Sequence, residues 1–210
     1  MQRIVLAVMP ALFATAFVAP PLYAETAAET QAAIQAEVQA YHPPPEGYPP
    51  AMGGAVLTEG ADTFYFTTFD YSIGAFDASA FFLGMESGAP TFTLTAWPNG
   101  DEDAKSGLLR VKGTFSGVIG PGSTDAAAVV AISIKETFRG RRWTSEGGEG
   151  VLVIDSFVPQ TPGSSSGYGH ATGHFTARIC SADGDPVVVA KNARCREVTG
   201  SFDTDVQYEP

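Results

Sequence analysis

The sequence predicts an all-β fold: a single antiparallel β-sandwich or barrel of about eight to ten strands, preceded by a signal peptide and a short helical arm. Three observations support this class. From Ala55 onward, apolar and polar residues alternate with a period of two. Turn-forming Gly, Pro, Asn and Asp recur at short intervals. The 186 residues (210 − 24) that follow the expected signal peptide suit one sandwich or barrel domain.

Residues 1–24 have the three parts of a secretory signal peptide. Arg3 gives the positive start, residues 4–18 form an almost continuous apolar run, and Ala24 is the small residue after which we expect cleavage. The run is shorter than the roughly 20 residues of a membrane-spanning helix. No later segment predicts a spanning helix, so we expect a periplasmic or secreted protein without a membrane span after signal removal.

Residues 25–50 predict a short helix followed by a proline-rich linker. Thr26-Ala-Ala-Glu29 matches a capping box, and Ile34, Val38 and Tyr41 then share one helical face. The prolines within residues 43–50 lack backbone donors, end the helix and favour an extended spacer. This arm leads to the β-domain, which we assign to residues 51–210.

Several runs inside that domain have the alternation and composition of strands. Residues 78–85 fit either a buried strand or a single helical turn. The clearest strand runs are Thr63–Phe69, Thr91–Trp97, Leu108–Ile119, Ala127–Phe138, Val151–Val158, Thr172–Cys180 and Glu197–Tyr208.

Three of these runs repeat a glycine two residues before a phenylalanine: Gly113-Thr-Phe115, Gly173-His-Phe175 and Gly200-Ser-Phe202. Both residues of each repeat share one face of their strand. Glycine in a strand permits close approach, and an aromatic ring from a neighbouring strand can cover its bare backbone. The repeat predicts strongly bent strands that curl the sheet, and a pocket lined by these phenylalanines is the alternative.

Cys180 and Cys195 are the only cysteines, and we expect them to form a disulfide, as cysteine pairs in exported chains usually do. Ile179 belongs to the inward set of its strand and Val198 to that of the next, so both cysteines face outward. Two sulfurs on the outer side of adjacent antiparallel strands fit a cross-link. Redox-active pairs usually have Cys-x-x-Cys spacing, so we interpret this pair as a structural clamp.

The charge of the chain excludes some classes of partner. The net charge is −11, and removal of Arg3 with the signal peptide makes it −12 (−11 − 1). Such a balance repels nucleic-acid backbones and anionic membranes. No P-loop or dinucleotide fingerprint occurs, so no cofactor is predicted.

Three short motifs resemble catalytic or metal-binding sites, but each lacks the secondary structure or the residues that such a site requires. Gly163-Ser-Ser-Ser-Gly167 matches the serine hydrolase pattern but precedes a strand rather than a helix. His170 and His174 have metal-ligand spacing only on a helix, whereas a strand is expected there. Asn99–Gly107 resembles a calcium loop without its required Gly and Glu. We therefore predict no catalytic and no metal-binding residues, although a hydrolase whose carboxylates come from distant strands stays an alternative.

One basic and aromatic cluster, which includes Lys135, stands out in this acidic chain. It fits either a site for an anionic sugar or a partner's carboxylates, or a hairpin with its charges in solvent. With the two histidines and a nearby tyrosine it completes the candidate binding residues: Arg139, Arg141, Arg142, Trp143, Tyr168, His170 and His174.

The C-terminal third, through Gly150–Ile154, Thr172–Ala177 and Val198–Phe202, resembles the closing hairpins of small secreted β-domains in uncharacterised bacterial families. The resemblance implies a sandwich or lipocalin-like barrel at the cell envelope and transfers no catalytic residue. We expect a non-catalytic binding or interaction domain for a protein or carbohydrate partner. A lipocalin-like barrel around a small apolar ligand and an outer-membrane barrel are further alternatives, beside the hydrolase.

Overall fold

A computed structural model of the whole chain describes residues 29–36, 50–70, 80–99, 108–133, 142–145, 150–183, 188–189 and 192–210. The predicted signal peptide, most of the proline-rich linker, Arg139 and Arg141 lie outside the described residues.

The described residues form a helix at 29–36 and a sheet of twelve strands, which confirms the all-β prediction and the short helical arm. Each predicted strand run overlaps an observed strand, and residues 80–83 of the ambiguous segment are a strand. The twelve described strands exceed the eight to ten expected. The strands are β1 (Ala51–Glu59), β2 (Asp62–Phe69), β3 (Ala80–Leu83), β4 (Thr91–Pro98), β5 (Leu108–Thr114), β6 (Ser123–Asp125), β7 (Val129–Ser133), β8 (Arg142–Thr144), β9 (Gly150–Pro159), β10 (Gly167–Asp183), β11 (Val188–Val189) and β12 (Cys195–Tyr208).

β5 is shorter than the predicted Leu108–Ile119. It ends at Thr114 because the chain turns where Gly117 and Gly122 adopt positive φ angles, a region that favours glycine. The Phe115 side chain that follows β5 is still buried in the core.

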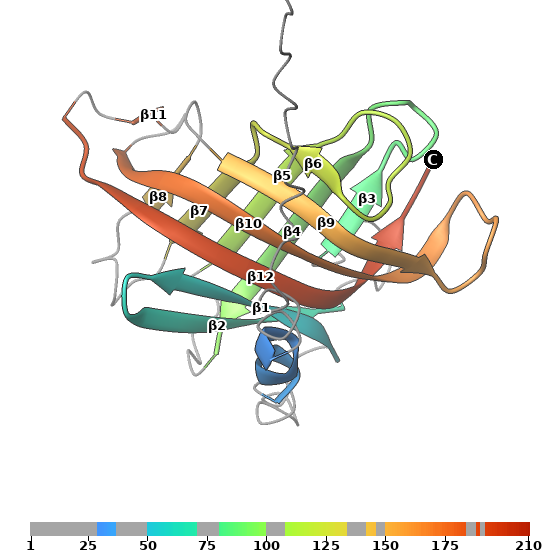
Figure 1. Cartoon of the computed structure of the whole chain (residues 1–210), viewed down its shortest axis with the longest axis horizontal. Coiled ribbons are helices and arrows are strands. Elements are labelled where there is room, and N and C mark those ends of the chain that lie inside the picture. Colours follow the sequence, from blue (N-terminus) through green and yellow to red (C-terminus); the bar gives the residue numbers. More distant parts are fainter. Residues whose placement is uncertain are drawn as a thin grey trace, which may run out of the picture.

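The strands close into a ring of hydrogen-bonded neighbours. Antiparallel pairings lead from β12 through β1, β2, β4, β5, β7, β8 and β10 back to β12. β3 joins β4 to β12 at the opposite end from β1 and β2, and its pairing with β12 is parallel. β9, β10 and β12 cross in front of β4, β5 and β7 (Figure 1), which makes the molecule a flattened barrel.

Between β5 and β10, the wall consists of the short strands β7 and β8, whose pairing ends at Ala131 and Thr144, while β6 pairs with β9. Where this pairing ends, the Val130 amide donates to the Ser145 hydroxyl at 2.8 Å, and this hydroxyl donates to the Ala128 carbonyl at 3.2 Å. The buried serine thus satisfies backbone groups that the interrupted ladder leaves.

Aromatic and aliphatic side chains fill the described interior. The Phe92 ring lies 5.1 Å from Phe202 and 4.9 Å from Phe82, and Phe82 lies 5.1 Å from Phe157, measured between ring centroids. Phe175 and Phe202 are almost fully buried within this core, so their rings pack chiefly against other core side chains.

The longest ladder joins β10 to β12, from the Gly167–Tyr208 pair to the Cys180–Cys195 pair. Within it, Gly173 lies opposite Phe202, and Phe175 lies opposite Gly200. A Cβ atom on Gly173 would come within 2.5 Å of Phe202 Cζ, and one on Gly200 would collide with the Phe175 ring. Each ring therefore covers the glycine of the other strand, as the sequence repeat predicts.

The third repeat differs, because Leu152 of β9 covers Gly113. A Cβ atom on Gly113 would lie 2.7 Å from Leu152 Cδ2. Glycine again permits close approach, but here to a side chain from another wall of the barrel.

The predicted disulfide is present, with a Cα–Cα distance of 4.0 Å. The Ser181 amide donates to the Arg194 carbonyl at 2.9 Å, so the two cysteines form a non-hydrogen-bonded pair, in which Cα atoms are closest. Both cysteines are half-buried, whereas Ile179 and Val198 are buried in the core. This confirms that both sulfurs lie on the outer side.

The reciprocal glycine–phenylalanine pairs generate a test of stability. Because each new methyl group would strike a ring or a carbonyl, we expect Gly173→Ala and Gly200→Ala to lower the free energy of unfolding by about 1–3 kcal/mol each, measured by urea denaturation. Gly120→Ala is the control, since its Cβ would meet nothing within 4 Å. Equal stability of Gly200→Ala and this control would show that the ring contact imposes no constraint.

The disulfide closes a short loop, with its cysteines 15 residues apart. We expect the double variant Cys180→Ala/Cys195→Ala to lose about 3 kcal/mol of unfolding free energy, because the denatured chain regains the entropy of that loop. Thiol alkylation of the denatured exported protein, read by mass spectrometry, should modify neither cysteine. Alkylation of both would show that the bond does not form.

Candidate binding site

The outer face of β1, β12 and β10 carries polar side chains in rows that cross the strands. Thr58, Thr199 and Thr176 lie opposite one another in one row. In the next row, Val56 lies opposite Ser201, and Ser201 lies opposite His174. Because alternate residues of a strand face opposite sides, the same strands bury their intervening side chains in the core.

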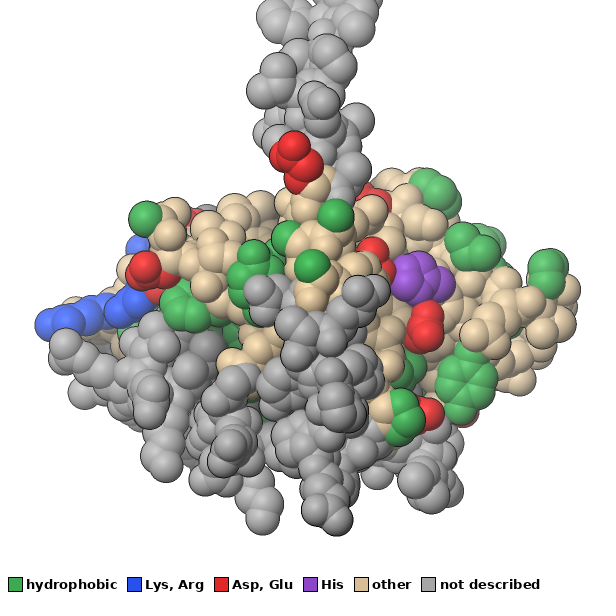
Figure 2. All heavy atoms as spheres, turned by 90° about the horizontal axis from the view of Figure 1, so that it is seen from below, with side chains coloured by type: hydrophobic (Ala, Val, Ile, Leu, Met, Phe, Trp, Pro, Cys, Tyr) green, Lys and Arg blue, Asp and Glu red, His purple; other side chains and the backbone are tan. Residues whose placement is uncertain are grey.

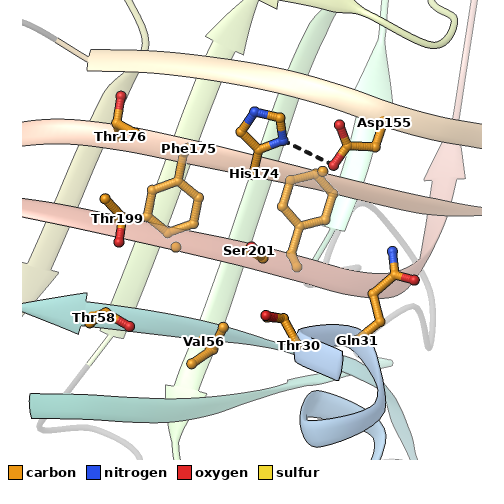
Figure 3. A pocket seen from close by; sticks show the side chains of 13 residues that line it. Thr30, Gln31, Val56, Thr58, Asp155, His174, Phe175, Thr176, Thr199 and Ser201 are labelled. Atoms are coloured by element: carbon orange, nitrogen blue, oxygen red, sulfur yellow. Dashed lines mark hydrogen bonds and ion pairs between the residues drawn. The ribbon is translucent and has the colours of Figure 1, made fainter. Parts of the chain in front are cut away.

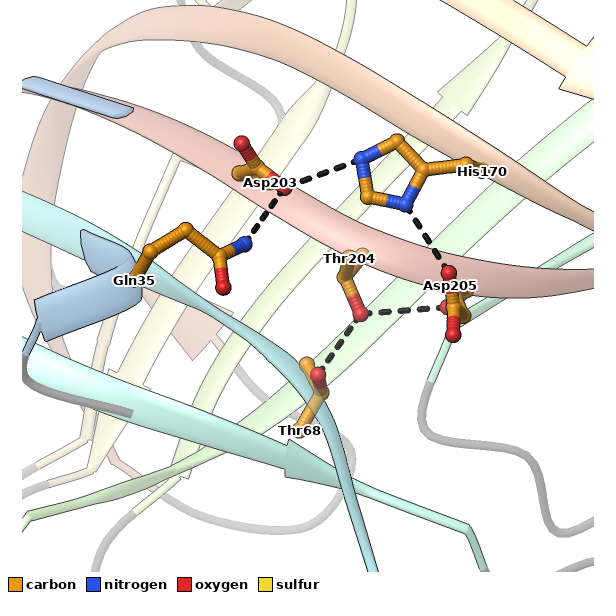
Figure 4. A network of polar contacts seen from close by, with 6 residues as sticks. All are labelled: Gln35, Thr68, His170, Asp203, Thr204 and Asp205. Carbon is orange, nitrogen blue, oxygen red and sulfur yellow. Dashed lines mark hydrogen bonds and ion pairs between the residues drawn. The ribbon is translucent and has the colours of Figure 1, made fainter. Parts of the chain in front are cut away.

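The helix at 29–36 lies against this face. Ile34 is buried against Val56, with Ala51 and Tyr65 packed around it. The Gln35 side-chain amide donates to Asp203 Oδ1 at 2.8 Å (Figure 4), and Asp203 is only 7% exposed. The helix therefore covers Val56, at one end of the second row, and leaves the other members of the two rows accessible.

A cleft of about 490 Å³ opens beside the helix. Its volume falls in the range of small-molecule sites. Figure 3 shows that its walls come from the helix and from strands β1, β9, β10 and β12. The lining residues are Thr30, Gln31, Val56, Thr58, Asp155, Gly173, His174, Phe175, Thr176, Thr199, Gly200, Ser201 and Phe202.

A carboxylate at a bulge in β9 lines this cleft. Thr172 pairs with Ser156 while Gly173 pairs with Ile154, so Asp155 is an extra residue in the ladder. Ile154 is buried and Asp155 is exposed, which continues the alternation of β9, and the bulge shifts the register of the residues that follow. The Nδ1–H of His174 donates to Asp155 Oδ2 at 3.0 Å (Figure 3).

His170 binds two carboxylates on the same face of the barrel. Its Nε2 lies 3.0 Å from Asp203 Oδ1 and its Nδ1 lies 2.9 Å from Asp205 Oδ1 (Figure 4). The hydrogen bond to Asp203 raises the pKa of His170 from its usual 6.5 to about 9; that to Asp205 adds to the rise, and partial burial opposes it. His170 is therefore a cation at neutral pH that holds both aspartates together.

Seen from below, histidine and acidic side chains lie together on this surface, and positive side chains gather at one end of the molecule (Figure 2). The basic groups of β10 and β12 are themselves paired: Arg178 lies 3.7 Å from Glu197, and Arg196 lies 2.7 Å from Glu59. Neighbouring carboxylates thus neutralise both of these arginines.

His170 and His174 both lie on strand β10, as the sequence predicts, and both face outward. Residues four apart on a strand are separated by about 13 Å at the usual rise. The two histidines bind different carboxylates, and the described part of the chain holds no group of three residues that could bind a metal ion. Only His174 lines the cleft.

The other candidate binding residues do not join them. Trp143 is buried in the core, with the Arg196 guanidinium 4.6 Å from the centre of its ring. Arg142 places its backbone in β8, and Tyr168 is 41% exposed near the start of β10. Of the basic cluster, the structure thus brings no side chain into the cleft among the residues that it describes.

Ser165 lies in the exposed loop between β9 and β10, which joins two strands. Within this loop, the Ser164 hydroxyl donates to the Ser166 carbonyl at 2.6 Å. The strand-to-helix turn of a serine hydrolase does not form here.

The cleft itself offers hydrogen bonds rather than a nucleophile. Ser201 lies opposite His174, but the imidazole leans toward Asp155 and away from Ser201 (Figure 3). Among the described residues, His174 and Asp155 bond to each other through one atom each, which leaves a ring nitrogen and a carboxylate oxygen for a ligand. The hydroxyls of Thr58, Thr199 and Ser201 can each donate and accept.

Sequence reasoning found one residue of the cleft as a candidate, His174, and missed the rest of its polar lining. The alternation Thr199-x-Ser201 beside inward Gly200 and Phe202 is the signal that could have placed two hydroxyls on the outer face. The alternation of β9 also places Asp155 on the outer face, but only the pairing of β9 with β10 sets it beside His174.

Comparison of the chain with protein-family models, with curated protein sequences and with solved structures gives no significant match. Within the described residues, no helix has both the length and the apolar character needed to cross a membrane.

The contacts of His170 generate a test of pH dependence. Its pKa in the folded protein lies above the 6.5 of an unperturbed histidine, so the protonated ring stabilises the fold fully below pH 6.5, and this stabilisation is lost as the pH rises through about 9. We expect about 1 kcal/mol, because the ring is nearly half exposed and water screens the pairs. Urea denaturation of wild type and His170→Gln should differ at pH 6 and converge at pH 10. An NMR titration that gives His170 a pKa near 6.5 would contradict this.

Proposed function

We propose that this protein is an exported, non-catalytic domain that binds an uncharged, hydroxyl-rich ligand, a carbohydrate, in the cleft beside the helix. The observation that carries the proposal is the arrangement of hydroxyls and the His174–Asp155 pair across four strands of one rigid wall. Side chains on paired strands are held in fixed relative positions, which suits recognition by several hydrogen bonds.

The chemistry of the lining favours a neutral sugar over other small molecules. Serine and threonine hydroxyls can both donate and accept, so they match the hydroxyls of a sugar ring in either sense. Val56 and the Cα groups of Gly173 and Gly200 also line the cleft and add a small apolar surface for the C–H groups of such a ring. The excess of acidic residues in the chain disfavours an anionic ligand.

Two observations support export. The disulfide is typical of proteins that fold in an oxidising compartment. The charged start, apolar run and small residue of positions 1–24 match a signal peptide. We place the protein in the periplasm or outside the cell on these grounds.

The alternative ligand site, the barrel interior, has less support. Phenylalanine rings about 5 Å apart occupy the described interior, and glycine backbones are covered by rings rather than by open space. A hydrolase has less support as well, because the imidazole of His174 is directed to Asp155 and away from the nearest serine across the strands.

Titration calorimetry with the neutral tetrasaccharides cellotetraose, maltotetraose and chitotetraose tests the proposal. We expect wild type to bind at least one of them, and His174→Ala and Asp155→Ala each to weaken that binding about tenfold or more, since each variant removes a hydrogen bond and leaves its partner unpaired.

Lys112→Ala is the matched control, because Lys112 is exposed on β5, in the opposite layer of the barrel, and should leave the affinity unchanged. Tetragalacturonate tests the charge argument and should bind more weakly than the neutral sugars. If His174→Ala bound the same sugar as tightly as wild type, the cleft would not be the site.

A further inference from the structure

We infer that the helix at 29–36 is a ligand-responsive wall of the cleft: it docks on the barrel, brings Thr30 and Gln31 to the ligand, and is held more firmly when the ligand is bound. The inference rests on the proposed function, because the ligand is the one proposed above. In this inference the helix is a mobile wall of the cleft, whereas the other walls are strands of the barrel.

The helix depends on the barrel for its existence. It has eight residues, and isolated helices shorter than about 12 are marginal in water. Its contacts with the barrel include the burial of Ile34 against Val56 and Tyr65 and the hydrogen bond from Gln35 to Asp203. These contacts are small beside the core, so we expect the helix to undock while the barrel stays folded.

Docking and ligand contact occur on the same side of the helix. Residues three and four apart in a helix share a face, so Thr30 and Gln31 lie one turn before Ile34 and Gln35 on the side that meets the barrel. Figure 3 shows Thr30 and Gln31 beside the open rows, and Figure 4 shows Gln35 reaching Asp203. A docked helix therefore delivers its first turn to the cleft, and an undocked helix withdraws it.

The Asp203 carboxylate, which binds the helix, is held in position by the barrel itself. Asp203 accepts from Gln35 and is also bound by His170, which in turn binds Asp205. The carboxylate is thus held in place by strands β10 and β12 alone. A ligand that contacts Gln31 binds the docked state better than the undocked one, and linkage requires that docking then strengthen ligand binding by the same factor.

The variant Ile34→Asp separates the helix from the barrel without entering the core, and hydrogen exchange reads the result. In the ligand-free mature chain, we expect this change to raise exchange of the amides at 33–36 at least tenfold and to shift the NMR signals of Val56 and Ser201. Protection of Leu94 and Val111, buried in β4 and β5, should stay the same. Protection of the helix that is equally low in wild type would mean that it does not dock, and would overturn the inference.

The same tetrasaccharides then test the response. Saturating wild type with the sugar that binds should slow helix exchange at least fivefold, and Ile34→Asp should bind that sugar at least tenfold more weakly. His174→Ala is the matched comparison, because it should lose affinity while its helix stays protected. Equal affinity of Ile34→Asp and wild type would overturn the coupling and leave the proposed function intact. Absence of binding by wild type would contradict the proposed function, and the ligand response with it.

Discussion

Two phenylalanine rings lie on the bare backbone of two glycines across the β10–β12 pair, Phe202 on Gly173 and Phe175 on Gly200. This fit fixes the register of the longest ladder, because a slip by one residue would turn every side chain of a strand to the other face. The outer surface inherits that register. His174 faces Ser201, and His170 faces Asp205, only because the inner pairs are aligned. The same β10–β12 register therefore determines both the packing of the core and the alignment of the polar rows.

The outer face carries the chemistry because the inner face is occupied by packing. Once the rings fill the described interior, polar groups that must stay hydrated or find partners belong on the other side of the same strands. There they sort into two groups. His170, Asp203 and Asp205 satisfy one another and fix the helix, whereas His174 and Asp155 face the cleft with atoms still available.

Features that depend on a strand's own alternation could be predicted from the sequence. The all-β class, the covered glycines and the outward cysteines need only local parity and one neighbouring strand. Prediction of the cleft also requires contacts between residues that are far apart in the sequence. Thr58 and Thr199 are 141 positions apart (199 − 58), and only the closure of the barrel sets them side by side. Alternation places Asp155 outward, but its contact with His174 depends on the pairing of β9 with β10, which alternation does not reveal. Trp143 was grouped with arginines by composition, but the pairing of β8 with β7 and β10 turns it into the core.

The position of β12 in the ring has a consequence for the order of folding. This strand borders β1 and β3 on one side and β10 on the other, yet it is the last of the described strands in the chain. In a chain that emerges from its N-terminus, β1 has an open edge until nearly the whole sequence has followed, and open edges can pair with other chains. Closure is therefore the final event, and loss of β12 would strip partners from three strands at once. The cross-link at Cys195 ties the start of this last strand to β10, so its pairing can spread from a fixed end.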